Sequence, residues 1–267
     1  MAERRRVLVT GAASGIGAAL VTQLRDDCEV LALDRTPLDP APGVEPLHCD
    51  LAEPAQVAAV VGELRGRVDA VAHVAGVPGT APAPTVLAVN VLAPLQLIGG
   101  LLPELPSDGS VVTVASIAAH RSAAPVEVVD ELLACTDPAG IAAWLGRHPH
   151  TGPEAYDVSK KALVRWTLLT AVRHLAGVRL NSVSPGPVET PILADFRASM
   201  GEADIERAAG AVGRHGHPEE VAAAVAFLLD PRASWIRGLD LPLDGGLTAL
   251  RAAAAANAPA TAPEETP

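Results

Sequence analysis

Tyr156 is the only tyrosine in the chain, and Lys160 and Lys161 are its only lysines. Tyr156 and Lys160 are four residues apart, so on a helix their side chains share one face. A free phenol ionises near pH ~10 and is a poor base at neutral pH, but a neighbouring ammonium group favours its phenolate form. The pair therefore indicates general acid–base chemistry on a hydroxyl or carbonyl group. The alternative interpretation is a pair on a helix surface with no catalytic role.

A glycine-rich loop lies near the start of the chain, where residues 10–17 read Thr-Gly-Ala-Ala-Ser-Gly-Ile-Gly. Gly11 permits a tight turn, Gly15 lets the backbone approach a pyrophosphate, and Gly17 lets a helix pack closely on a strand. The start of that helix supplies partial positive charge. An ordinary flexible turn is the alternative, but the loop follows a predicted strand, and Asp34 closes the next strand roughly 20 residues later. The context predicts a dinucleotide site, whose nicotinamide cation would further favour the phenolate of Tyr156.

Three charged residues near this loop bear on the choice of cofactor. Asp34 has the position of a carboxylate that accepts hydrogen bonds from the adenosine ribose and repels a 2′-phosphate, which favours NAD(H) over NADP(H). Arg35 follows it and could partly neutralise that repulsion. Asp50 ends the third predicted strand, where its carboxylate could accept from the adenine amine. An N-cap for the helix that begins near Pro54 is an equally good interpretation of Asp50.

Asn90 is a polar residue in an apolar stretch, four residues before Pro94. In a helix the N–H of residue 94 would bond to the carbonyl of residue 90, but proline has no N–H. We therefore expect a free Asn90 carbonyl and a kink that holds a water, which could link Lys160 to solvent as a proton relay. A proline that merely bends a core helix is the alternative, and it leaves the polar Asn90 unexplained.

Strand and helix patterns alternate along the chain. This order implies right-handed crossovers and a doubly wound α/β fold, with a parallel sheet covered by helices on both faces. Pro242 places the last strand at a sheet edge. The predicted strands are residues 5–10, 29–34, 44–48, 70–75, 110–115, 179–183 and 239–243, and the predicted helices are 16–24, 54–64, 85–102, 153–175 and 219–229.

Composition excludes several classes of function. The 267 residues carry a net charge of -11, which argues against nucleic acid and anionic membrane surfaces, and 2% aromatic residues offer little for base stacking. The three cysteines are odd in number and lack metal-ligand spacing, so we expect reduced thiols and no metal site. No compact apolar region follows the basic residues 1–6, and the apolar run 87–102 is too short to cross ~30 Å of hydrocarbon. We expect a cytoplasmic protein that binds no membrane.

Taken together, these motifs resemble the short-chain dehydrogenase/reductase family and its Rossmann-type sheet of about seven strands. The resemblance rests on residues 10–17, Asp50, Ser116, Tyr156 with Lys160, Pro185-Gly186 and Asp244-Gly245-Gly246, and it covers nearly all of the chain except the tail. It implies that Tyr156 is the general acid–base, that Lys160 lowers the pKa of Tyr156 and binds the nicotinamide ribose, that Ser116 hydrogen-bonds the substrate oxygen, and that Asn90 is the fourth catalytic position. It assigns cofactor contacts to Gly11, Ser14, Gly15, Ile16, Gly17, Asp34, Arg35, Asp50, Leu51, Ala75, Gly76, Tyr156, Lys160, Pro185, Gly186, Val188 and Thr190, of which Val188 and Thr190 would orient the nicotinamide carboxamide.

The chain departs from the family pattern in two places. His73-Val74-Ala75-Gly76 stands where asparagines usually precede Ala-Gly, which bears on a hydrogen bond between neighbouring strands more than on the chemistry. The insert at 117–152 is far longer than most family members have. Such inserts resemble the bacterial 3α-hydroxysteroid dehydrogenase/carbonyl reductase branch and its relatives that oxidise aryl alcohols, where they alter the usual helix-to-helix subunit contact and favour dimers.

Two short helices, 126–133 and 138–145, are predicted within the insert, with Asp137 capping the second. His148 and His150 could suggest a metal, but no third ligand is evident, so surface histidines are the better interpretation.

The sequence therefore predicts an NAD(H)-dependent oxidoreductase that interconverts a hydrophobic secondary or aryl alcohol and its carbonyl, as a homodimer or homotetramer. Residues 1–250 would form one catalytic domain, with a substrate flap at 188–217, and residues 251–267 a low-complexity tail that is disordered or a frayed helix at its start. The flap residues Ile192, Leu193, Phe196 and Met200 suggest a hydrophobic substrate under a lid. The alternatives are a catalytically silent NAD-binding regulator and an NAD-dependent epimerase or dehydratase.

Overall fold

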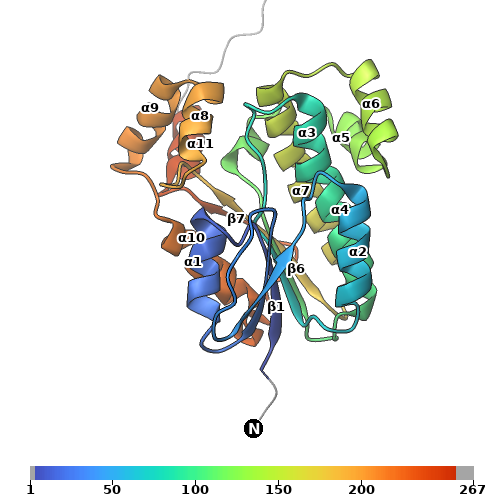
Figure 1. Cartoon of the computed structure of the whole chain (residues 1–267). Helices are drawn as coiled ribbons and strands as arrows, with labels where there is room; N and C mark the ends of the chain where they lie inside the picture. Colours follow the sequence, from blue (N-terminus) through green and yellow to red (C-terminus); the bar gives the residue numbers. More distant parts are fainter. Residues whose placement is uncertain (1–3, 257–267) are drawn as a thin grey trace, which may run out of the picture.

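The computed structural model describes residues 4–256. Seven parallel strands form one sheet in the order β3-β2-β1-β4-β5-β6-β7, which confirms the predicted doubly wound α/β architecture (Figure 1). The chain order reverses between β1 and β4, and in such sheets ligands bind at the carboxyl ends of the strands beside this reversal. The strands are β1 (Arg6–Thr10), β2 (Glu29–Asp34), β3 (Val44–His48), β4 (Ala70–His73), β5 (Ser110–Val114), β6 (Arg179–Pro185) and β7 (Asp240–Leu243).

Helices cover both faces of the sheet (Figure 1). On one face α1 (Gly15–Leu24) packs against α10 (Pro218–Leu229), and their apolar residues form one core with alternate side chains of the strands. On the other face lie α2 (Pro54–Leu64), α4 (Ala93–Leu101) and α7 (Gly152–Arg173). The strands are buried on both sides, as the continuous apolar runs in the sequence indicate.

Most strand positions agree with the sequence prediction, and each of the two edge strands contains a proline. Pro242 lies in β7 and Pro46 in β3, the outermost strands, where a missing N–H removes no ladder bond from a central strand. The fourth strand is shorter than predicted. It ends at His73 because the N–H groups of Val74 and Ala75 turn to the hydroxyl of Thr10.

The predicted helix 85–102 is a composite that starts earlier. Residues Ala83–Leu87 form α3, Ala88–Leu92 widen into a π-helical turn, and α4 follows. Pro94 lies just after the π turn, so the predicted distortion at Asn90 is present, as a widened turn. By length and composition the segment Ala83–Glu104 could span a membrane, contrary to our expectation of too short a run, but 67% of its apolar window is buried inside the fold.

The insert after Ser116 folds as predicted into two short helices, α5 (Val126–Leu133) and α6 (Pro138–Arg147). The Asp137 carboxylate caps α6 by accepting from the N–H of Gly140 at 2.7 Å. Trp144 is fully buried, donates to the Val128 carbonyl, and packs its ring against His148 and His150. In the structure these two histidines therefore contact the small core of the insert.

The predicted flap contains α8 (Leu193–Met200) and α9 (Glu202–Val212), and α11 (Leu247–Ala256) lies beside them (Figure 1). The described start of the predicted tail, 251–256, is thus part of a helix. The rest of that prediction, 257–267, lies outside the described residues.

Candidate active site

Ser116 and Tyr156 face one cavity of about 470 Å³ at the carboxyl ends of the strands. Ser116 follows β5 as the N-cap of a short 3₁₀ turn, where its hydroxyl accepts from the N–H of Ala118 at 3.2 Å. Tyr156 lies in the first turns of α7, and its ring packs 5.2 Å from that of Phe196 in the flap. The two hydroxyl-bearing residues thus meet although 40 residues separate them in the chain.

Lys160 lies one turn along α7 from Tyr156 and is buried. Its Nζ donates to the carbonyl oxygen of Val114 at 3.0 Å and lies 5.7 Å from the centroid of the Tyr156 ring. A Cβ built on Gly76 would lie 3.2 Å from this Nζ and equally far from the Asn90 Oδ1. The absence of a side chain at Gly76 therefore leaves room beside the ammonium group.

Burial dominates the electrostatics of this pair. It raises the pKa of the Tyr156 hydroxyl to about 12. The smaller effects of the Ser116 hydrogen bond and the Arg121 charge oppose this rise, and the charge of Asp157 adds to it. Burial also lowers the pKa of Lys160 to about 8. The lowered tyrosine pKa expected from Lys160 is therefore not found in the chain alone, because the cost of burying a phenolate outweighs the groups that favour it, Ser116 and Arg121.

Asn90 sits inside the π turn, and its side chain links three elements. The Oδ1 accepts from the N–H of Val77 at 2.9 Å, and the Nδ2 donates to the Val77 carbonyl at 3.0 Å and to the Ser159 hydroxyl at 3.2 Å. The Ser159 hydroxyl in turn donates to the Tyr156 carbonyl at 2.7 Å. Asn90 thus ties the loop after β4 to the helix that carries Tyr156 and Lys160.

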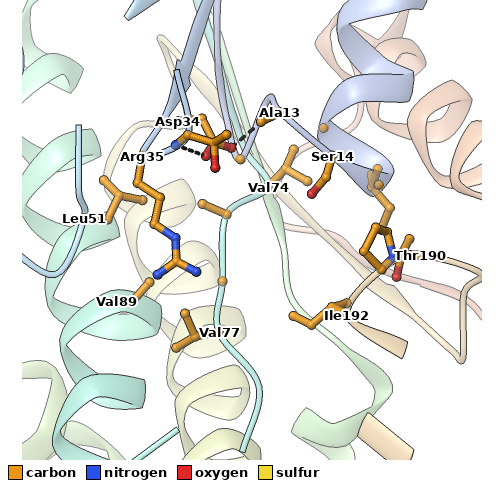
Figure 2. Close-up of a pocket in the computed structure, with 18 of the residues that line it drawn as sticks. Ala13, Ser14, Asp34, Arg35, Leu51, Val74, Val77, Val89, Thr190 and Ile192 are labelled. Carbon is orange, nitrogen blue, oxygen red and sulfur yellow. Dashed lines mark hydrogen bonds between the residues drawn. The ribbon is translucent and has the colours of Figure 1, made fainter. Parts of the chain in front are cut away.

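A second cavity, of about 480 Å³, lies over the glycine loop (Figure 2). Gly11 and Gly15 have positive φ angles of 70° and 53°, in the region that favours glycine. A Cβ on Gly17 would lie 2.0 Å from the Gly11 carbonyl oxygen, so helix and strand approach closely there, as predicted. The exposed loop backbone and the start of α1 form a cradle that fits a dinucleotide pyrophosphate.

The carboxylate of Asp34 lies at the edge of this cavity, beside the glycine loop. Its Oδ2 accepts from the N–H of Ala13 at 3.0 Å and its Oδ1 from that of Thr36 at 2.8 Å. Figure 2 shows the Arg35 side chain running away from this carboxylate, toward Val77 and Val89. The negative charge is therefore fixed at the loop, and the guanidinium group of Arg35 lies on another part of the wall of the same cavity.

Asp50 also lines the cofactor cavity, but it is not the N-cap of α2. Its Oδ1 accepts from the N–H of Ala52 at 2.9 Å and closes a short turn, and the N-cap position belongs to Glu53. The capping interpretation was wrong because the chain makes this extra turn before the helix begins.

Most of the other predicted cofactor residues line one of the two cavities, and two of them line neither. Thr190 lines the cofactor cavity together with Ser14, Ile16, Leu51, Ala75 and Gly76. Gly186 lines the cavity of Tyr156 instead. Pro185 ends β6, and Val188 is buried and bridges to Gly216; neither lines either cavity.

His73 preserves a hydrogen bond between neighbouring strands where the family pattern has asparagine. Its Nδ1 lies 3.1 Å from the hydroxyl of Thr10. That hydroxyl already accepts from two backbone N–H groups, so it donates to Nδ1 and the ring carries its proton on Nε2. Burial, with a smaller effect of the Lys160 charge, lowers the pKa of His73 to about 3, and its Nε2 is buried without a partner among residues 4–256.

Comparison with known proteins identifies the family. The family model described as short chain dehydrogenase matches residues 5–128, and one described as enoyl-(acyl carrier protein) reductase matches residues 141–248. Coniferyl-alcohol dehydrogenase of Pseudomonas sp. is 32% identical over 247 residues, which cover 91% of this chain and 96% of that protein. The chain is a short-chain dehydrogenase/reductase. It therefore belongs to a family of oxidoreductases that bind a nicotinamide cofactor.

Two further relatives of this short-chain dehydrogenase/reductase bear on its site. The 3-alpha-hydroxysteroid dehydrogenase/carbonyl reductase of Comamonas testosteroni is 28% identical over 251 residues, 91% of this chain and 96% of that one. A crystal structure of the 3-alpha-hydroxysteroid dehydrogenase from Pseudomonas sp. B-0831, complexed with NADH, is 38% identical with a TM-score of 0.81, and the match covers 93% of this chain and 98% of that one.

Sequence reasoning missed the part of the dehydrogenase that closes the cavity of Tyr156. Helix α11 contributes Leu247, Leu250, Arg251 and Ala254 to the lining, together with residues of α8 and α9. These four positions have the i, i+3, i+4, i+7 spacing of one helix face. That spacing could have been found, but the alanine-rich composition after residue 251 made the segment look like a tail.

Proposed function

We propose that this short-chain dehydrogenase/reductase uses NAD(H) to interconvert a hydrophobic secondary or aryl alcohol and its carbonyl compound. One observation carries the proposal: Tyr156 and Ser116 open into a mostly apolar cavity that adjoins the dinucleotide cavity. The segment 190–196 borders both, with Thr190 and Ile192 on the cofactor side and Leu193 and Phe196 on the Tyr156 side. An alcohol in the second cavity would thus lie between the tyrosine and the cofactor.

The chain's own residues would handle the proton and the orientation of the alcohol. In oxidation the Tyr156 phenolate takes the hydroxyl proton, and Ser116 holds the oxygen by a hydrogen bond. When bound, the nicotinamide supplies the acceptor for the hydride of the alcohol carbon. Lys160 offers the nicotinamide ribose its ammonium group and stabilises the phenolate. The π turn at Asn90 would hold a water that passes the proton from Lys160 toward solvent.

The preference for NAD over NADP follows from Asp34. Its carboxylate is fixed beside the glycine loop by two backbone N–H groups, where the adenosine ribose hydroxyls would lie. A 2′-phosphate would meet this negative charge at close range. Arg35 is directed away from Asp34, so it does not neutralise the carboxylate (Figure 2).

The relatives favour a cyclic or aryl alcohol as substrate. Three of their names give coniferyl alcohol, 3α-hydroxysteroids and cis-4-hydroxycyclohexanecarboxylate, all of them alcohols that contain a carbon ring. The lining of the Tyr156 cavity by Leu193, Phe196, Met200 and Ile205 suits such an apolar body.

The function is tested by following NADH formation across steroid, aryl and aliphatic alcohols, with NADP in parallel. We expect turnover of at least one cyclic or aryl alcohol, with NAD preferred. Tight NAD binding without turnover of any alcohol or ketone would contradict the proposal and favour a catalytically silent regulator.

We also propose a homodimer, formed at the edge of the sheet that ends in β7. Trp235 is 96% exposed there, and Phe227 of α10 and Leu239 beside β7 are exposed apolar residues on neighbouring elements. On the opposite side of the molecule, α5 of the insert packs on α7, and the ion pair of Asp130 with Arg165 joins the two helices. The insert therefore covers the surface of α7 that a partner subunit would otherwise contact.

Light scattering after chromatography should give a dimer for the wild type and a monomer for Trp235→Asp. An unchanged dimer in the variant would contradict this interface.

A further inference from the structure

The cavity that holds Tyr156 is apolar over most of its wall, but most of its charged residues are basic although the chain as a whole is acidic. Its charged lining residues are three arginines, Arg121, Arg207 and Arg251, against one acid, Asp204. The chain as a whole has a net charge of -11. A local excess of cations in an acidic protein indicates a site built for negative charge.

Two of the three arginines already have partners. The guanidinium group of Arg121 donates to the Asp157 carboxylate at 2.8 Å, and that of Arg207 pairs with Asp204 one turn away on α9. The guanidinium group of Arg251 makes no hydrogen bond or ion pair with any residue in the part of the chain that the structure describes. Arg251 is therefore the cation of the cavity that is available to a ligand.

Arg251 is an exposed residue of the cavity wall, whereas Tyr156 is a buried one. Leu247 is buried and packs against Ile117 and Ala208, near Ser116. Arg251 follows one turn later on α11, about 6 Å farther along the axis, and is exposed. A ligand that extends from Tyr156 along α11 would thus contact Leu247 at the buried part of the wall and the guanidinium group of Arg251 at the exposed part.

We propose that the substrate is an alcohol or ketone with a hydrophobic body and a distal carboxylate, and that Arg251 binds this carboxylate. This inference rests on the proposed function and names its substrate class. A guanidinium group offers two parallel N–H donors that match the two oxygens of a carboxylate. Because Arg251 is exposed, water screens the pair, and we expect a preference of roughly tenfold and no more.

The test compares ligands that differ only in the distal group. The pair is 4-(1-hydroxyethyl)benzoate and its primary amide, together with the longer biphenyl homologues of both. Calorimetry measures their dissociation constants with the NAD-saturated Tyr156→Phe protein, in which no turnover interferes. The same measurement on Arg251→Gln, Arg251→Lys and the control Arg65→Gln shows whether this one side chain matters. Arg65 is an exposed arginine at the far end of α2, away from the cavity.

We expect at least one acid to bind about tenfold more tightly than its amide. Arg251→Gln should remove most of this preference, Arg251→Lys should restore part of it, and Arg65→Gln should leave it unchanged. Equal binding of acid and amide at both lengths, no measurable binding of either, or a preference that survives Arg251→Gln would overturn the inference.

Turnover by the wild-type enzyme separates this inference from the proposed function. Oxidation of acid and amide with equal kcat/KM would leave the function standing and overturn the carboxylate site. Selective binding of the acid that depends on Arg251, without oxidation of any alcohol, would support the site and contradict the function.

Discussion

The ammonium group of Lys160 donates to the carbonyl oxygen of Val114, the last residue of β5, at 3.0 Å. Ser116 follows two residues later, so one strand end positions both the lysine and the serine of the site. The strand is central in the sheet and fully buried, which makes it a rigid support. The spacing between Lys160 and Ser116 is therefore set by the sheet, and not by α8 and α9 on the other side of the cavity.

Replacing Lys160 should damage turnover more than folding. Lys160→Met removes the cation beside the Tyr156 ring, and we expect kcat to fall by roughly two orders of magnitude, the usual size of an acid–base contribution. The neighbouring Lys161→Met is the matched control, because Lys161 donates only to the Ser122 and Ala124 carbonyls of the insert. Equal losses in both variants would contradict the role of Lys160.

The pH dependence should have opposite signs in the two directions. Burial raises the pKa of Tyr156 to about 12, so below that value each pH unit increases the phenolate fraction about tenfold. Alcohol oxidation, which uses the phenolate, should rise from pH 6 toward pH 8. Above that the slope should decrease, because burial lowers the pKa of Lys160 to about 8 and its charge is lost. Carbonyl reduction uses the phenol and should not rise with pH, and initial rates in both directions check this.

His73 should make the fold sensitive to acid. Its pKa is lowered from 6.5 to about 3 by burial, so the neutral ring stabilises the fold above pH 6.5, and this contribution is lost as the pH falls toward 3. At pH 4.5 the loss is on the order of 2 kcal/mol. Urea unfolding at pH 7 and 4.5 should show a smaller difference for His73→Asn than for the wild type. The exposed His48→Asn should behave as the wild type, and an unchanged pH effect in His73→Asn would contradict the assignment.

Asp34→Asn should relax the choice of cofactor. The amide keeps one acceptor oxygen, which serves the N–H of either Thr36 or Ala13 and gives up the other bond, and it removes the charge that would face a 2′-phosphate. We expect the ratio of kcat/KM for NADP to that for NAD to rise roughly tenfold or more. Asp108→Asn, an exposed acid at the opposite end of the sheet, is the control for net charge. A ratio unaltered by Asp34→Asn would show that another group selects the cofactor.

Much of this arrangement could be predicted from the sequence, because interactions between residues close together in the chain determine it. Asp34 ends its strand, Pro94 lies just after the widened turn that contains Asn90, and Asp137 caps a helix of the insert. Each of these features has a cause that acts within a few residues. The parallel order of the strands then brings Ser116 and Tyr156 to the same end of the sheet.

The features that sequence reasoning missed depend on contacts between distant segments. The hydrogen bond of His73 to Thr10 requires the register of β4 against β1. The pKa of Tyr156 is raised because its side chain is deeply buried, and the spacing of residues in the sequence does not reveal this burial. Arg251 joins the cavity only because α11 folds back over Ile117, more than a hundred residues away in the chain.

The most direct test of the account replaces Tyr156 by phenylalanine and measures NAD binding and alcohol oxidation on the same protein. The hydroxyl is removed while the ring that packs on Phe196 stays. We predict that calorimetry gives an NAD affinity within about threefold of the wild type, while oxidation of the best alcohol falls by at least about three orders of magnitude. Retention of oxidation by the variant would contradict the central claim that Tyr156 is the acid–base of an alcohol dehydrogenase.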